Sequence, residues 1–287
     1  MEPSVLIVDS QVHIWDKGTP SRFHRQAPYS AAQLLADMDE GGVDRAVICP
    51  PMWDPDSNQM AVAAAQAHPG RLAVMGWIHV EQPESRSLVA RWKERPGMLG
   101  LRLYFQKPHE QSCPTDGTMA WLWSAAERAG VPIAMKAESF LPALGRIAER
   151  HPGLKLAVDH MAVPSGGRGA AAYRHHPELL DLARYPNIAV KITGQPAYAV
   201  DEYPFRSTHV YLQRTFDAFG PERMFWGTDI TKIPCPWRQC VTMFTEELPW
   251  LRGRDLERVM GRAFCDWAGW DLPQDAGGGG RGMSPAG

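Results

Sequence analysis

The sequence has no marked excess of charge of either sign and no long apolar run. Its 287 residues include 30 lysines and arginines against 32 aspartates and glutamates, for a formal net charge of -2. Without a basic stripe or an acidic tail, neither nucleic acid nor a membrane surface is an expected partner. No stretch approaches the roughly 18 apolar residues of a membrane helix. The N-terminus also lacks the basic and apolar regions of a signal peptide, so none is expected.

Closely spaced cysteine motifs are missing as well. The five cysteines are Cys49, Cys113, Cys235, Cys240 and Cys265, and none belongs to a Cys-x-x-Cys motif. An odd, scattered set of this kind is typical of reduced thiols rather than of a disulfide framework. We therefore expect a cytoplasmic protein.

Short apolar runs alternate with helical stretches along almost the whole chain. After a strand that begins at Val5, strands are predicted at 45–49, 72–78, 98–105, 132–137, 154–160, 188–193 and 224–229. Helices are predicted at 31–38, 58–68, 85–94, 118–129, 141–150, 177–184, 210–219, 239–247 and 255–267. Turn signals such as His68-Pro69-Gly70 and His151-Pro152-Gly153 end helices just before strands.

This alternation predicts an α/β protein with a parallel sheet, and eight units favour a closed (β/α)8 TIM barrel over an open sheet. We expect one barrel domain over residues 1–273. The Gly-rich tail at 274–287 is expected to be disordered.

The first strand ends in three polar residues at alternate positions, Asp9, Gln11 and His13. Alternate residues of a strand share one face, so all three are expected to point the same way. Polar groups that converge from a buried strand are costly unless they bind one another or a ligand. The trio is therefore either a hydrogen-bonded knot in the core or part of a binding site.

Active sites of such barrels lie at the C-terminal ends of the strands. The polar residues near those ends, besides the first strand's trio, are His79, Arg102, Tyr104, Lys136, Glu138, Asp159, His160, Lys191 and Asp229. His13, His160 and Asp229 are the strongest candidates. Imidazoles with a carboxylate suit zinc and similar divalent ions, and they also suit proton transfer without a metal.

The other polar residues near the strand ends can also be explained by a structural role. Arg102 and Glu138 are equally well explained as a buried ion pair. Lys136 and Lys191 fit an ion-pair belt of the barrel better than catalysis. Asp159 is expected to hold a neighbouring side chain in place, and His79 to be structural or to face solvent.

These motifs resemble the amidohydrolase superfamily, specifically the amidohydrolase-2 group. The resemblance extends from about Val5 to Trp270. It rests on Asp9-Ser10-Gln11-Val12-His13, Gly100-Leu101-Arg102, Asp159-His160 and Gly227-Thr228-Asp229. The group contains sugar-acid lactonases, the pyrone dicarboxylate lactonase and metal-dependent decarboxylases.

The resemblance implies roles for individual residues. His13 matches the second histidine of the first strand, His160 a later histidine, and Asp229 the aspartate that acts as general base. Arg102 matches an arginine that contacts acidic substrates in some lactonases, and we expect Tyr104 and Gln11 to bind substrate with it. Gln11 stands where the family's first histidine would be.

Because Gln11 replaces this histidine, the sequence does not decide whether a metal ion is bound. A divalent ion, zinc by resemblance, would rest on His13, His160 and Asp229. The lactonase branch also includes members that work without a metal.

The sequence therefore predicts a metal-dependent-type hydrolase of a small lactone, cyclic ester or amide-like bond. Asp229 would activate water, while His13 and His160 polarise the carbonyl group. The alternatives are a decarboxylase of a small, often aromatic, carboxylic acid on the same barrel, and a barrel that binds a small molecule without catalysis. The expected partners are a small-molecule substrate and, by resemblance, a second copy in a homodimer through the outer helices.

Overall fold

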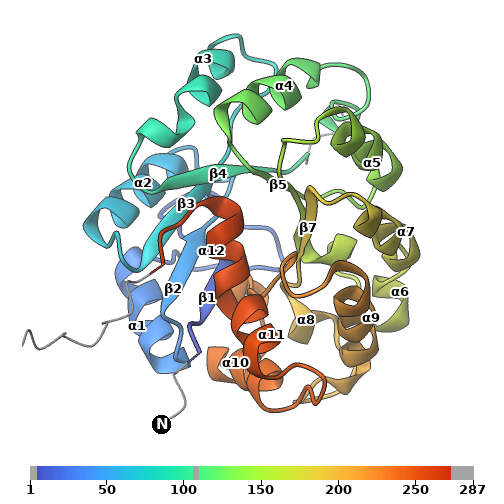
Figure 1. The fold of residues 1–287 in the computed structure, drawn as a ribbon. Coiled ribbons are helices and arrows are strands. Elements are labelled where there is room, and N and C mark those ends of the chain that lie inside the picture. Colours follow the sequence, from blue (N-terminus) through green and yellow to red (C-terminus); the bar gives the residue numbers. More distant parts are fainter. Residues whose placement is uncertain (1–4, 106–109, 273–287) are drawn as a thin grey trace, which may run out of the picture.

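Eight parallel strands form one sheet whose order follows the sequence from β1 to β8 (Figure 1). The computed structural model describes residues 5–105 and 110–272, so the Gly-rich tail lies outside the described part. The strands are β1 (Val8–Val12), β2 (Arg45–Ile48), β3 (Leu72–Gly76), β4 (Met98–Leu103), β5 (Ile133–Met135), β6 (Leu156–Val158), β7 (Ile188–Lys191) and β8 (Met224–Phe225). The predicted (β/α)8 barrel is confirmed.

Most of the helices follow a strand and lie around the outside of the sheet (Figure 1). The helices are α1 (Ala31–Gly41), α2 (Ser57–Ala67), α3 (Glu84–Ala90), α4 (Ala120–Ala129), α5 (Leu141–Arg150), α6 (Gly169–Ala172), α7 (His176–Asp181), α8 (Gln195–Tyr198), α9 (His209–Phe219), α10 (Trp237–Thr245), α11 (Gly253–Glu257) and α12 (Ala263–Ala268). Local signals set their ends. Ser30 and Gln33 form a capping box at the start of α1, and Gly42 ends it in the left-handed conformation. Within the described ranges no helix is long and apolar enough to cross a membrane.

The inside of the barrel is closed at one end by α12, which crosses the strands in Figure 1. The residues of the strands that face this helix are mostly small, among them Ala73, Ala134 and Ala157. Their size makes room for Phe264, whose ring meets that of Phe225 edge-on at a centroid distance of 5.6 Å. An apolar cluster thus fills one end of the barrel and leaves the strand C-termini at the other end for polar side chains.

The last strand is shorter than predicted, and the closing helix is not continuous. Trp226 leaves the ladder with β7: its N–H donates to the Val259 carbonyl and its carbonyl accepts from Ser10 on β1. Val259 lies in a π-helical segment, Arg258–Arg262, between α11 and α12. The predicted helix at 255–267 is therefore interrupted where its backbone bonds to the end of the sheet.

A bulge in β1 corrects the expectation that Asp9, Gln11 and His13 share one face. Between Asp9 and Val12 the strand carries one residue more than β2, and such an extra residue shifts the alternation of side chains. The Asp9 carboxylate turns toward β8, where it accepts hydrogen bonds from the Thr228 N–H and hydroxyl. It joins the two edges of the sheet, and only Gln11 and His13 reach the polar centre of the barrel.

Candidate active site

The polar centre gathers side chains from the C-terminal ends of different strands, as the barrel fold predicts. His13 directly follows β1, His160 follows β6 and Asp229 follows β8. All three are at least 97% buried. The structure brings the three predicted residues together: an Asp229 oxygen lies 3.0 Å from His13 Nε2 and the other lies 3.8 Å from His160 Nε2.

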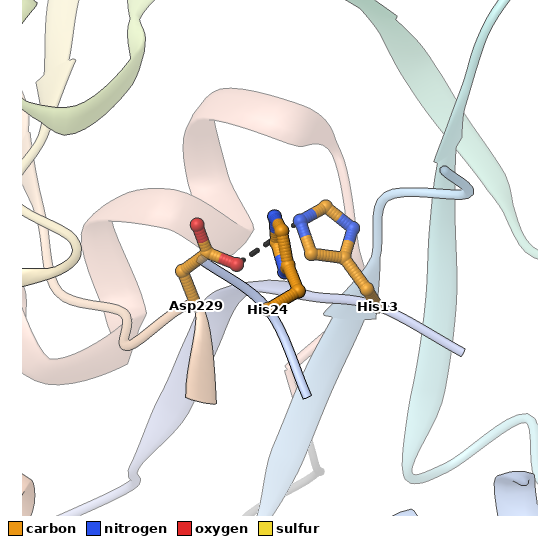
Figure 2. Close-up of side chains that lie close together, drawn as sticks. All are labelled: His13, His24 and Asp229. Atoms are coloured by element: carbon orange, nitrogen blue, oxygen red, sulfur yellow. Dashed lines mark ion pairs between the residues drawn. The ribbon is translucent and has the colours of Figure 1, made fainter. Parts of the chain in front are cut away.

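The protonation of His13 follows from its neighbours. Its Nδ1 contacts the carbonyl oxygen of Cys49, which can only accept a hydrogen bond, so Nδ1 carries a proton. Its Nε2 faces the Asp229 carboxylate, another acceptor (Figure 2). Two hydrogen-bond acceptors repel each other at 3.0 Å unless a proton or a cation lies between them. Either the ring carries a second proton, or a cation neutralises the pair.

Asp229 is held as an anion. Burial by itself raises its pKa, but the Lys232 ammonium and His13 more than offset this and place the pKa well below the ordinary value of 3.8. Lys232 contacts one carboxylate oxygen at 2.5 Å. The residue adopts the left-handed conformation, with φ at 58°, and its N–H donates to the Gln11 carbonyl. This sharp turn at the end of β8 directs the carboxylate into the barrel.

His160 stands on a more unusual turn. His160, Met161 and Ala162 are all left-handed, with φ between 54° and 58°. Each such residue costs about 1–2 kcal/mol without glycine, and strain of this kind is concentrated at functional sites. The turn places the imidazole inside the barrel, where its Nδ1 lies 2.6 Å from the Thr193 hydroxyl.

The contacts of Gln11 determine which ring nitrogen of His160 carries the proton. Lys191, which can only donate, contacts Gln11 Oε1 at 3.1 Å, so the Gln11 amide group must face His160 Nε2 at 3.3 Å. His160 Nε2 then accepts and Nδ1 carries the proton. Burial lowers the His160 pKa well below 6.5, and Lys232 lowers it further, so the ring is neutral.

This arrangement counts against two predictions, substrate binding by Gln11 and metal binding by His160. Gln11 is fully buried and its amide is engaged by Lys191 and His160. A direct contact of Gln11 with substrate therefore has no support in the geometry. The same amide covers the His160 nitrogen that would ligate a metal ion, which counts against His160 as a ligand in this arrangement.

Like Lys232, His24 was not singled out from the sequence. It lies in the loop between β1 and α1, whose two ends pair through a bridge between Trp15 and Tyr29. The loop folds over the barrel mouth and sets His24 beside His13 and Asp229 (Figure 2). No periodicity marks a loop residue, and its spacing from His13 matches no motif.

The surroundings of His24 keep its ring neutral. Burial lowers its pKa to about 3, although Asp229 acts in the opposite direction. Its Nδ1 lies 2.8 Å from the Thr231 hydroxyl. A neutral imidazole is the form that binds metal ions.

The charged residues near the strand ends do not form the predicted ion pair between Arg102 and Glu138. Arg102 pairs with Asp159 through its Nε at 2.9 Å, not with Glu138, and Glu138 instead pairs with Lys136 at 2.7 Å. Lys191 also contacts Asp159, at 3.3 Å. Asp159 thus holds both cations, and its pKa lies far below the ordinary value because their charges outweigh its burial. His79 is partly exposed, and its Nδ1 lies 4.0 Å from Glu81.

Two adjoining cavities open above the site, with volumes of about 140 and 280 Å³. Lys136, His160 and Lys232 line both. His13, Arg102 and Tyr104 also line the smaller one, while Tyr198 and Arg168 line the larger. Among the described lining residues there is no carboxylate, so the space suits a polar or anionic small molecule.

The amidohydrolase family model matches residues 8–280. The chain belongs to the amidohydrolase-2 family. This assignment confirms the resemblance noted from the motifs and identifies the protein as an enzyme of the hydrolase type.

Individual relatives of this amidohydrolase are distant. It is 25% identical over 219 residues to an L-fucono-1,5-lactonase of Burkholderia ambifaria, a match that covers 75% of this chain and 73% of that protein. The fold is similar to that of an amidohydrolase from Burkholderia multivorans solved with bound zinc, with a TM-score of 0.77, 18% identity and coverage of 93% and 100%. A putative 2-pyrone-4,6-dicarboxylic acid hydrolase from Pseudomonas putida gives a TM-score of 0.73, 19% identity and coverage of 94% and 100%.

The side chains of this amidohydrolase fit a single divalent ion. His13, His24 and Asp229 each offer a ligand atom, and these atoms lie within 4.8 Å of one another. Both Asp229 oxygens are buried, and among the described residues none donates a well-oriented hydrogen bond to them. Two imidazoles and one carboxylate are a ligand set of catalytic zinc sites, which keep a further position open.

Proposed function

We propose that this enzyme hydrolyses a small lactone, with Asp229 as the general base. The observation that carries the proposal is the buried Asp229 carboxylate, which contacts His13 and Lys232, two residues that line the smaller cavity. An ionised carboxylate is able to take a proton from water as a general base. The likeness to an L-fucono-1,5-lactonase supports a lactone as the substrate class.

The chain's own residues provide each proton and charge. Asp229 accepts a proton from water as the water oxygen bonds to the lactone carbonyl carbon. When the ring C–O bond breaks, the ring oxygen takes that proton back from Asp229. Water is thus added across the bond, and the carboxylate is regenerated.

The developing oxyanion needs a positive group, and Lys232 is in position to provide it. Its ammonium contacts Asp229 and also lines both cavities. As negative charge grows on the carbonyl oxygen, Lys232 stabilises it and releases its hold on Asp229, which makes the carboxylate more basic. His160, with no proton on Nε2, is suited to accept a hydrogen bond rather than to polarise a carbonyl group.

A divalent ion, zinc by family resemblance, would be held by His13, His24 and Asp229. When bound, it would supply Lewis-acid stabilisation of the oxyanion.

The role of His24 as a ligand is tested by titrating zinc into chelator-treated protein and measuring the affinity. His24→Gln should weaken binding by about tenfold or more, whereas His68→Gln, at an exposed position, should not. Equal affinity in the two variants would remove His24 from the site.

The role of Asp229 is tested by Asp229→Asn on a panel of sugar-acid lactones. We expect kcat to fall about a thousandfold with the circular dichroism spectrum unchanged. Asp217→Asn on the exposed face of α9 is the matched control. Undiminished turnover by Asp229→Asn would refute the assignment.

The same panel separates the other functions. Release of carbon dioxide from an aromatic carboxylic acid, with no lactone opened, would indicate a decarboxylase. Binding of a lactone without turnover would indicate a barrel that has lost catalysis.

A further inference from the structure

Two cysteines that form no Cys-x-x-Cys motif lie close together near the active site. Cys235 and Cys240 place their sulfur atoms 3.8 Å apart. Cys240 lies in the first turns of α10 and is 2% exposed, while Cys235 precedes the helix and is partly exposed. The turn into α10 brings the two thiols together although four residues separate them.

We propose that Cys235 and Cys240 are a peroxide-sensitive dithiol whose oxidation to a disulfide alters the active site. The sulfur atoms must approach by about 1.8 Å to reach the bond length of a disulfide. The thiol contact itself lowers the pKa of Cys235, so its thiolate forms more readily, whereas the pKa of Cys240 is raised. The exposed partner is therefore the nucleophile, and the buried partner resolves the intermediate.

The chemistry balances with hydrogen peroxide as the oxidant. The Cys235 thiol releases its proton, and the thiolate attacks one peroxide oxygen. The O–O bond breaks, which leaves a sulfenic acid on Cys235 and a hydroxide ion that combines with the released proton as water. The Cys240 sulfur then attacks Cys235, the S–S bond forms and the S–O bond breaks. The departing hydroxide takes the Cys240 proton and leaves as water. Two thiols and one peroxide give one disulfide and two waters.

The loop between β8 and α10 connects this pair to the site. Cys235 is flanked by Pro234 and Pro236, which fix their own backbone φ angles and stiffen the segment. Lys232 lies three residues before Cys235 and holds the Asp229 carboxylate. Pro234 and Lys232 both line the larger cavity. Because Cys240 is buried in α10, we expect the approach of Cys235 to shift the loop, and Lys232 with it.

The other cysteines provide an internal comparison. Cys49, Cys113 and Cys265 are buried, and burial raises the pKa of each thiol, that of Cys265 to about 11. Thiols of this kind react slowly with peroxide. Oxidation of the folded protein should therefore start at Cys235.

The test treats the full-length protein with a small excess of hydrogen peroxide and maps its peptides without reduction. We expect a Cys235–Cys240 disulfide that forms in the wild type and disappears with dithiothreitol. Cys235→Ser and Cys240→Ser should form none. Absence of the cross-linked peptide from folded wild-type protein would overturn the proposal.

The effect on the site is measured in two ways. Hydrogen exchange of residues 229–237 should change on oxidation of the wild type but not of Cys235→Ser, whatever the substrate proves to be. Lactone hydrolysis should fall at least about tenfold in kcat/KM and return on reduction, while untreated Cys235→Ser keeps its full activity. A disulfide that leaves both readouts unchanged would contradict the coupling to the site.

Discussion

Gln11 holds the neutral ring of His160 in one orientation, since Lys191 fixes the amide from the other side. Gln11→Glu keeps an acceptor for Lys191 but presents no N–H to His160. We expect kcat to fall about tenfold or more, with little change in melting temperature. Gln213→Glu, on the exposed face of α9, serves as the control. A normal kcat in Gln11→Glu would show that the orientation of His160 does not matter.

Asp9 gives stability a distinct dependence on pH. Burial raises its pKa from 3.8 to about 7, although hydrogen bonds from Thr228 and Gln11 act against this. Between these values the unfolded chain has released the proton and the folded protein has not, so folding stability falls as pH rises. The unfolding free energy of the wild type relative to Asp9→Asn should fall by on the order of 4 kcal/mol from about pH 4 to pH 7.

Denaturant titrations of both proteins across this range would measure the difference. Other titrating groups are common to the two proteins and cancel. A difference that rises with pH would mean that the three hydrogen bonds to Asp9 outweigh its burial.

Individual residues were predictable where a strand end placed them. His13, His160 and Asp229 could be selected because parallel strands present their C-termini to one centre. His24 could not, because a loop over the barrel mouth delivers it. The direction of Asp9 was predicted wrongly, because a bulge depends on the register with β2, which the residues of β1 alone do not reveal.

At the scale of elements, the edges of the sheet meet at a crowded joint between β1 and β8. A Cβ atom on Gly227 would lie 2.7 Å from both Ser10 Oγ and Thr193 Cγ2, and 2.9 Å from Asp9 Oδ1. Gly227→Ala should therefore destabilise the protein by about 1–3 kcal/mol, measured by chemical denaturation. Gly70→Ala, with nothing within 4 Å of the added atom, should change stability by less than about 1 kcal/mol. Equal effects of the two substitutions would mean that the joint relaxes freely.

Helices were predicted better than the ends of strands for a physical reason. The signals that end a helix are local, and α5 occupies the predicted residues 141–150. The end of β8 depends instead on distant partners, since Trp226 bonds to Ser10 and Val259 rather than continuing the ladder. The π-helical segment follows from the same distant contact, and no short window of sequence contains it.

For the whole molecule, the apolar cluster at the end opposite the site makes α12 part of the barrel core. Phe264 is 3% exposed and packs inside the ring of strands. Phe264→Ala should cost about 3–5 kcal/mol of stability. If the apolar end serves mainly as support, kcat at low temperature should remain close to that of the wild type. A folded variant with kcat reduced a hundredfold would show that the two ends of the barrel are coupled.

The position of α12 also determines how late in its synthesis the protein can complete its fold. Val8, in the first strand, belongs to the same apolar cluster as Phe264, near the end of the described chain. While the ribosome is still building the final helix, the earlier strands have no cover for their inner surface. Contacts between such distant parts of a chain form slowly. We therefore expect the barrel to complete its fold only after α12 has left the ribosome, with its apolar inner surface exposed until then.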